Sequence, residues 1–252
     1  MGLGVMRLMP SFVKISAGLT SFRGNLYLVD KVYAHFRDVD WPVSAPPSVS
    51  GIRFDRAIEL KGVDFFYPDT AKSALENINL TIAKNATIGI VGKSGAGKTT
   101  LMNLLLGLFE PIRGEICVDG VSIHNHVREW QLQVGYVPQF IYLLDDTLEH
   151  NILFGLERDE QRLQEVLRLA NLEDVVEKLP LKGQTLIGQN GVRLSGGQRQ
   201  RLGIARALYK QPSFLVFDEA TSALDNETER AISDSIAQLK HQLTIVIVAH
   251  RY

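Results

Sequence analysis

Gly92-Lys93-Ser94-Gly95-Ala96-Gly97-Lys98-Thr99-Thr100 is the stretch that decides the fold of this chain. It fits the phosphate-loop pattern G-x-x-x-x-G-K-[ST]. The run before it, residues 87–91, is short, apolar and β-branched, which is typical of a buried strand, and residues 101–107 after it are predicted to be helical. A strand, a glycine-rich loop and a helix in this order are the context that the motif requires.

The residue types in this loop suit a chain of phosphates. Glycines let the backbone curl so that successive N–H groups point inward, and the N-terminus of the following helix adds its positive dipole end. Lys98 is then expected to reach the β- and γ-phosphate oxygens, and the Thr99 hydroxyl to hold Mg²⁺. The alternative is a glycine-rich turn with a chance lysine, and the two correct flanks argue against it.

Bulk composition limits the remaining possibilities. The chain has 252 residues, of which 45% are hydrophobic and 22% charged, as in ordinary globular proteins. A formal net charge of −1 gives no basic field, so no nucleic-acid partner is predicted. The lone Cys117 excludes an intramolecular disulfide and fits a reducing compartment. No uninterrupted apolar run reaches about 18 residues, and no signal peptide is recognisable.

The first 40 residues differ from the rest of the chain in their pattern of apolar and charged residues. Within residues 1–40 apolar residues recur at roughly helical spacing with charged residues between them, which predicts one or two amphipathic helices with Pro10 capping or kinking the start. Such a stripe either packs on its own domain or needs a partner. Residues 41–56 are rich in Pro, Ser and Ala and are predicted to be a linker, so the main domain is expected over 57–252.

Strands and helices alternate through the main domain. Alternating or β-branched apolar runs predict strands at 58–63, 78–82, 87–91, 115–120, 134–137, 213–217 and 244–248, and helices are expected within 147–180, at 199–209 and at 228–239. The predicted fold class is therefore α/β, with a mixed sheet that has an antiparallel portion near the start and a parallel core, and with a helical subdomain.

Polar residues follow several of the predicted parallel strands, where ligands collect in open α/β sheets. Asp218 and Glu219 directly follow the strand predicted at 213–217. Asp218 would bind Mg²⁺, and Glu219 would activate a water. An N-cap pair is the alternative for these carboxylates. His250 follows 244–248 and is expected to contact the γ-phosphate, unless it is a structural histidine. Gln139 follows 134–137 and is a weaker candidate by itself.

A second glycine-containing loop precedes the predicted helix at 199–209. Leu194-Ser195-Gly196-Gly197-Gln198 offers backbone N–H groups and a hydroxyl at a helix start, which makes either a second anion site or a plain capped helix.

Taken together, these motifs resemble the nucleotide-binding domain of ATP-binding cassette (ABC) proteins, a class of P-loop NTPases, from about residue 57 to the end. Residues 92–99 are similar to Walker A and 214–218 to Walker B. The resemblance assigns roles to further residues: Glu219 as the catalytic glutamate, 194–198 as the signature, Gln139 as the Q-loop residue that also contacts the metal, Asp225 in the D-loop, and His250 as the switch histidine. Tyr67, at the end of Val63-Asp64-Phe65-Phe66-Tyr67, resembles the aromatic under the adenine; otherwise it is a core aromatic at a strand end.

The resemblance also implies a mechanism and partners. ATP and Mg²⁺ are the expected ligands, and two copies are expected to dimerise head to tail with ATP between them. Ser195, Gly196, Gly197 and Gln198 of one copy would complete the site formed by the phosphate loop of the other. Closure of this dimer on ATP and its opening after hydrolysis would supply the motion.

Finer similarities favour the exporter branch of the family. Residues 185–191 resemble the loop with which exporters touch their membrane domain, and residues 7–33 resemble the cytoplasmic end of the last transmembrane helix of half-transporters. This implies an ATPase at the cytoplasmic face of the membrane, held there by a transmembrane domain, with lipid-linked oligosaccharide flippases as the nearest resemblance. One alternative is a soluble ABC-type ATPase, but the chain lacks the coiled-coil insertions or second cassette that such proteins usually have. The other is a nucleotide-binding module without turnover, and the presence of Lys98, Asp218, Glu219 and His250 argues against it.

The chain also departs from the family pattern. Asn85 stands where the family usually has glycine, but Asn tolerates the left-handed conformation that this turn needs. The sequence ends at Tyr252, shortly after His250, whereas the family normally continues, so either a fragment of a longer half-transporter or a truncated reading frame is expected.

Overall fold

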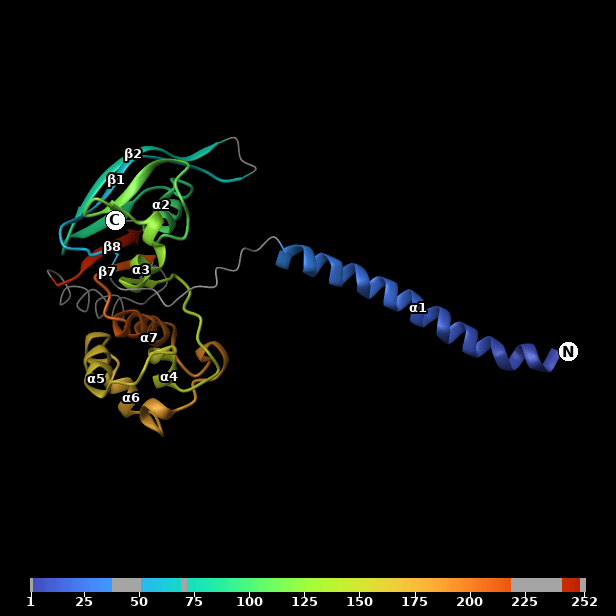
Figure 1. The fold of residues 1–252 in the computed structure, drawn as a ribbon. Coiled ribbons are helices and arrows are strands. Elements are labelled where there is room, and N and C mark those ends of the chain that lie inside the picture. Colours follow the sequence, from blue (N-terminus) through green and yellow to red (C-terminus); the bar gives the residue numbers. More distant parts are fainter. Residues whose placement is uncertain (1, 38–50, 69–71, 219–241, 250–252) are drawn as a thin grey trace. The chain divides into compact units, whose positions relative to one another are not determined.

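The computed structural model describes residues 2–37, 51–68, 72–218 and 242–249. The chain divides into two units, residues 1–46 and 47–252, and each is described by itself. The first contains the helix α1, and the second contains all the strands and the remaining helices (Figure 1).

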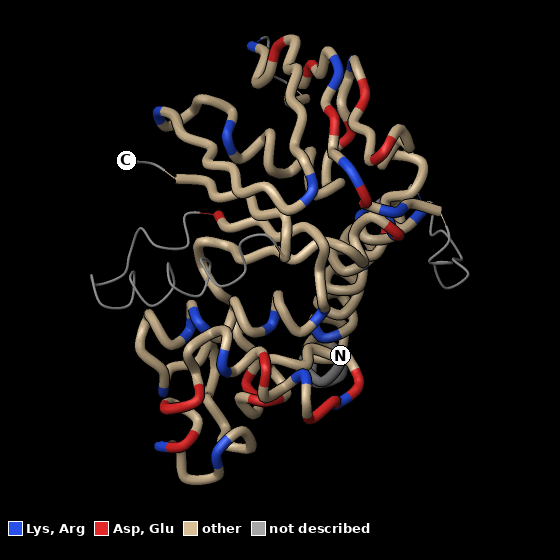
Figure 2. Tube along the Cα trace, turned by 90° about the vertical axis from the view of Figure 1, so that its left-hand side faces the viewer, with Lys and Arg blue, Asp and Glu red and all other residues tan. Residues whose placement is uncertain are grey.

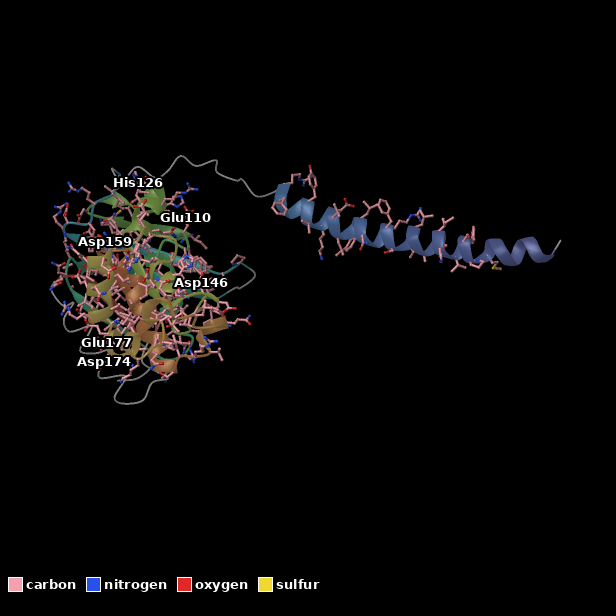
Figure 3. All side chains as sticks on the ribbon, turned by 90° about the horizontal axis from the view of Figure 1, so that it is seen from below. Glu110, His126, Asp146, Asp159, Asp174 and Glu177 are labelled. Atoms are coloured by element: carbon pink, nitrogen blue, oxygen red, sulfur yellow. The ribbon has the colours of Figure 1, made fainter. Side chains whose placement is uncertain are left out.

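Helix α1 (Gly2–Arg37) is continuous and has Pro10 inside it. The large apolar side chains described between Met9 and Phe36 are exposed, and Figure 3 shows the described side chains projecting outward from this helix. Leu26 and Leu28 are both exposed and, at 3.6 residues per turn, point about 200° apart. A helix was correctly predicted here, but the amphipathic stripe is wrong, because apolar residues occupy opposite sides of α1. Among the described residues, no helix has the length and apolar character needed to cross a membrane.

The first sheet of the second unit is antiparallel. Within the described residues its strands are β1 (Ala57–Phe66), β2 (Ser73–Ala83), β4 (Arg113–Val118) and β5 (Val121–Ser122), in the order β2-β1-β4-β5. Along β1 the buried residues alternate, with Ile58 and Leu60 fully inside. The register shifts between Leu60 and Val63, where Gly62 has a φ of 58°. A positive φ of this kind suits a bulge at glycine, after which the buried residues continue on the same face.

The second sheet is parallel and forms the centre of the unit. It contains β3 (Thr87–Val91), β8 (Thr244–Ala249), β7 (Phe214–Asp218) and β6 (Val134–Val137), in the order β3-β8-β7-β6. Successive side chains of a strand point to opposite faces. Leu215 and Phe217 accordingly pack with the helical part, whereas Phe214 and Val216 pack in the cluster that contains α2 (Lys98–Leu105). The predicted antiparallel and parallel portions are thus confirmed, but in the described residues they form two separate sheets rather than one mixed sheet.

The helical part gathers on one side of the parallel strands (Figure 1). It contains α4 (Leu148–Leu153), α5 (Glu160–Leu169), α6 (Glu173–Glu177) and α7 (Gly196–Tyr209), while α3 (Val127–Leu132) precedes β6. Short 3₁₀ turns lie at His124–His126, Lys182–Gln184 and Gln189–Gly191. Figure 2 shows acidic and basic residues of both signs interspersed in the outer parts of this unit, whereas its central strands carry few of them.

Two details concern the predicted boundaries and turns. Ile52 and Phe54 lie in the predicted linker at 41–56, yet both are buried in the core, and the ring of Phe54 meets Trp130 edge-on. The predicted domain boundary at residue 57 therefore excludes these two core residues. Two isolated apolar residues form no periodic pattern, so the sequence gives no sign that they are buried. Asn85 has a φ of 60°, so the left-handed turn expected there is present. The helix predicted at 228–239 lies outside the described residues.

Candidate functional site

The phosphate loop joins the end of β3 at Val91 to the start of α2 at Lys98. Gly95 and Gly97 have φ values of 78° and 84°, a region that side chains rarely adopt. A Cβ atom on Gly97 would lie only 2.6 Å from the carbonyl oxygen of Ala74. Glycine is therefore required here for both its backbone conformation and its small volume.

Lys98 is buried at the centre of this loop. Its Nζ atom donates hydrogen bonds to the carbonyl oxygens of Gly92, at 2.9 Å, and Lys93, at 3.1 Å. The side chain is 7% exposed, so its charge is held by the backbone that surrounds it. A phosphate oxygen entering the loop would compete for the same ammonium protons.

A cavity of about 240 Å³ opens beside the loop. It is lined by Tyr67, Ala74, Ser94, Gly95, Gly97, Lys98, Thr99 and Thr100. The Tyr67 hydroxyl lies 2.9 Å from the Thr100 hydroxyl, and the Tyr67 ring is edge-on to Phe65 and Phe109. Tyr67 is 38% exposed, so the structure brings it to the loop with part of its surface open rather than enclosing it in the core.

The parallel register sets the distance of Asp218 from the loop. Val91 pairs with Ala249 on β8, and Val248 pairs with Asp218 on β7. Asp218 therefore lies at the same end of the sheet as the loop, two strands away, or about 10 Å at the usual strand spacing. Because side chains alternate, it shares a face with Val216, the face against which α2 packs. Asp218 and the first turn of α2, with Thr99, thus lie on one side of the sheet.

Tyr136 of β6 is a neighbour of Asp218 that the sequence did not single out. Its hydroxyl donates a hydrogen bond to Oδ2 of Asp218 at 3.2 Å. Burial, followed by the negative charge of Asp218, raises the pKa of Tyr136 to about 12. The phenol therefore stays protonated at neutral pH and acts as a donor. Its one sequence clue is its place near the end of a strand.

Gln139 is exposed and follows the end of β6. The adjoining carbonyl of Pro138 lies 3.5 Å from the side-chain nitrogen of Gln200, which is on α7. The segment with Gln139 therefore lies next to the helix that starts at the predicted signature.

Ser195 and Gln198 form a reciprocal cap at the start of α7. The Ser195 hydroxyl accepts a hydrogen bond from the Gln198 N–H at 3.2 Å, and the Gln198 side chain accepts one from the Ser195 N–H at 2.9 Å. A Cβ atom on Gly196 would meet no atom of the described residues within 4 Å. The helix start is thus open toward solvent beside Gly196, while Gly197 is buried. The capped helix predicted as the plainer alternative is present, and its open end leaves the predicted anion site accessible.

Arg206 and Asn151 were also missed, and they tie α7 to the segment after Gln139. Arg206 donates hydrogen bonds to the carbonyl oxygens of Asn151 and Tyr142, each at 2.8 Å, and to the Asn151 side chain at 3.0 Å. Its guanidinium lies 4.6 Å from the ring centre of Phe154. Asn151 in turn bonds both backbone groups of Leu144.

An apolar groove lies near these contacts. It has a volume of about 450 Å³ and is lined by Phe140, Ile141, Tyr142, Gln189, Asn190, Val192 and Arg199. Phe140, Tyr142 and Val192 are more than 70% exposed: 72%, 79% and 75%.

The predicted metal ligands fit Mg²⁺ by chemical type. Thr99, Gln139 and Asp218 offer hydroxyl, amide and carboxylate oxygens, and Mg²⁺ in nucleotide sites uses few protein oxygens together with phosphates. Within the described part of the chain no cluster of His, Cys, Asp and Glu forms a self-sufficient metal site. Glu219, Asp225 and His250 lie outside the described residues.

Comparison with known proteins gives consistent results. The sequence profile of a family described as ABC transporter matches residues 75–222. An ATP-dependent lipid A-core flippase of Paraburkholderia xenovorans is 37% identical over 93% of this chain and 43% of its own length. One from Cupriavidus pinatubonensis is 41% identical over 86% of this chain and 38% of its own length.

A solved structure is also similar. It is a bacterial Atm1-family ABC exporter with ATP bound, with 32% sequence identity and a TM-score of 0.77, and the similarity covers 91% of this chain and 41% of the exporter chain. This chain therefore spans less than half the length of the relatives that it matches.

Proposed function

The chain belongs to the ABC transporter family, and from this premise we propose that it binds and hydrolyses ATP to drive a membrane exporter or flippase. The observation that carries the proposal is the arrangement at one end of the parallel sheet. A glycine loop around a buried Lys98 opens onto a cavity, and Asp218 lies at the same sheet end on the face of α2.

Each site residue receives a role in this proposal. Lys98 and the N–H groups of Gly92–Gly97 bind the β- and γ-phosphates, and Tyr67 stacks on the adenine. Thr99, Asp218 and Gln139 would hold Mg²⁺, which neutralises developing charge on the phosphates when bound. Glu219 orients and deprotonates the attacking water, and His250 contacts the γ-phosphate.

Dimerisation completes the site. The open start of α7 at Ser195 presents N–H groups and a hydroxyl in addition to those of the phosphate loop, which suits capture of a phosphate held by a second copy. In this head-to-tail arrangement Gly196, Gly197 and Gln198 extend the same anion site, and we assign Asp225 to binding of the shared nucleotides.

The partner in transport is proposed to be a transmembrane domain, which would hold the chain at the cytoplasmic face of the membrane. The groove at Phe140, Tyr142 and Val192 exposes aromatic and aliphatic surface beside the segment of Gln139, and a helix of such a domain would cover it. The names of the relatives favour a lipid-linked saccharide as cargo and favour export over a soluble ATPase.

The test is ATPase turnover of this chain, alone and in place of the matching part of the P. xenovorans flippase. Turnover that requires Lys98 and rises with lipid A-core in the hybrid would support the proposal. Turnover in the hybrid that lipid A-core does not change would contradict the flippase assignment, and an inactive hybrid with an active P. xenovorans parent would contradict the ATPase role.

A further inference from the structure

The contact between Tyr136 and Asp218 joins neighbouring strands at the nucleotide end of the sheet. Tyr136 pairs in register with Val216 of β7, and its side chain reaches along the sheet face to Oδ2 of Asp218. The residues are 82 positions apart in sequence, so the contact depends wholly on the pairing of β6 with β7.

Both side chains lie on the face of the sheet against which α2 packs. Val134 of β6 and Val216 of β7 belong to the cluster that includes Met102 and Leu104 of α2. Tyr136 and Asp218 each follow one of these valines by two positions, which places them on the same face. β6 flanks β7 on the side away from β8, and Tyr136 is 37% exposed, so it reaches Asp218 from that side without closing the site.

We propose that Tyr136 is a positioning residue that holds the Asp218 carboxylate in the orientation needed to bind the metal of a metal–ATP complex. This inference rests on the proposed function and deepens it. A carboxylate on a strand end can rotate about its side-chain bonds, and a hydrogen bond to one oxygen fixes the plane of both. Partners of this kind, which bond to a metal ligand rather than to the metal, commonly orient it.

The chemistry of the pair suits this role. The phenol is neutral and donates a hydrogen bond, so it orients the carboxylate and leaves its negative charge in place. An arginine in an ion pair would offset part of that charge. No proton is transferred and no bond is made or broken. The predicted effect lies in metal-dependent affinity and not in the fold.

The test removes the hydroxyl alone. The full chain is prepared as wild type, Tyr136→Phe, Asp218→Asn and the double variant, with Tyr27→Phe as a matched control that loses a hydroxyl from exposed α1. A non-hydrolysable ATP analogue is titrated by calorimetry in excess EDTA and in Mg²⁺, and Mn²⁺ binding in the presence of the analogue is followed by electron paramagnetic resonance.

We expect Tyr136→Phe to weaken analogue binding in Mg²⁺ by roughly threefold to tenfold, the usual effect of one lost hydrogen bond, and to weaken Mn²⁺ binding equally. Its affinity in EDTA and its melting temperature should equal those of wild type. Asp218→Asn should remove the benefit of metal, and the double variant should be no worse, because the tyrosine acts through the aspartate.

Several results would overturn the inference alone: equal losses in EDTA and Mg²⁺, an unchanged affinity in Mg²⁺, or additive losses in the double variant. A wild-type chain that binds no nucleotide, or binds it without benefit from metal, would overturn the proposed roles of the loop or of Asp218 and this inference with them.

Discussion

The ammonium group of Lys98 lies 2.9 Å from the carbonyl oxygen of Gly92, at the opposite end of the loop that the lysine terminates. The bond to Lys93 at 3.1 Å adds a second tie, so the loop is already curled around a positive charge. An ATP molecule would therefore meet a preformed site, and little of its binding free energy would go into ordering the loop.

Lys98→Ala should weaken ATP binding by about tenfold or more, because hydrogen bonds to a charged group are among the strongest in proteins. Calorimetric titration of the chain with ATP measures this effect. Lys84→Ala is the matched control, since Lys84 forms an exposed ion pair with Asp55 away from the loop. Normal affinity in Lys98→Ala would rule out the phosphate-binding role.

Gly97→Ala should disrupt the loop more severely than its size suggests. The new Cβ would lie 2.6 Å from the Ala74 carbonyl oxygen and 2.9 Å from a Leu75 methyl group, at a φ of 84°. We expect a loss of about 1–3 kcal/mol in the free energy of unfolding, and loss of ATP binding. Gly89→Ala is the control, because its Cβ would meet no described atom within 4 Å. Urea unfolding and calorimetry follow the two effects, and a stable, ATP-binding Gly97→Ala would contradict the proposed geometry.

The sequence alone was sufficient to predict the parts of the site whose residues lie close together along the chain. The loop around Lys98 and the cap between Ser195 and Gln198 involve short separations, so their motifs indicate structure directly. The contact of Tyr136 with Asp218 spans 82 positions, and that of Arg206 with Asn151 spans 55. These contacts depend on which strands and helices become neighbours, which local patterns do not specify. The fold class followed from the order of strands and helices, whereas the amphipathic stripe predicted for α1 is wrong because Leu26 and Leu28, both exposed, lie on opposite sides of the helix.

Arg206→Ala should destabilise the helical part. It removes hydrogen bonds to Asn151 and Tyr142 and the contact with the ring of Phe154. We expect the free energy of unfolding to fall by about 2–4 kcal/mol, as measured by urea titration. Arg206→Lys should recover only part of this, because lysine lacks the planar fork. Arg168→Ala, at an exposed position of α5, is the control, and equal stability of Arg206→Ala and Arg168→Ala would refute the role.

Asp119 should make stability depend on pH. Burial acts to raise the pKa of its carboxyl, but hydrogen bonds from the N–H groups of Ala57, Asp55 and Arg56 outweigh burial and lower it. A carboxyl with a lowered pKa stabilises the fold above its unfolded value, about 3.9, and the effect is lost as pH falls through the folded value. Asp119→Asn should therefore lower the urea midpoint at neutral pH, and its difference from wild type should shrink below about pH 4. A difference that is constant across this range would show that the charge is not responsible.

Glu219→Gln separates binding from hydrolysis. The amide keeps the size of the side chain but cannot take a proton from water, so turnover should fall by about 10²- to 10⁴-fold while ATP affinity is kept. Because sites completed by Ser195 of a second copy would then hold ATP without consuming it, ATP should also shift this variant toward a dimer in light scattering. Glu177→Gln, on the exposed side of α6, should change neither property. Unchanged turnover in Glu219→Gln would assign the base to another residue, and a variant that stays monomeric at saturating ATP would contradict the head-to-tail arrangement.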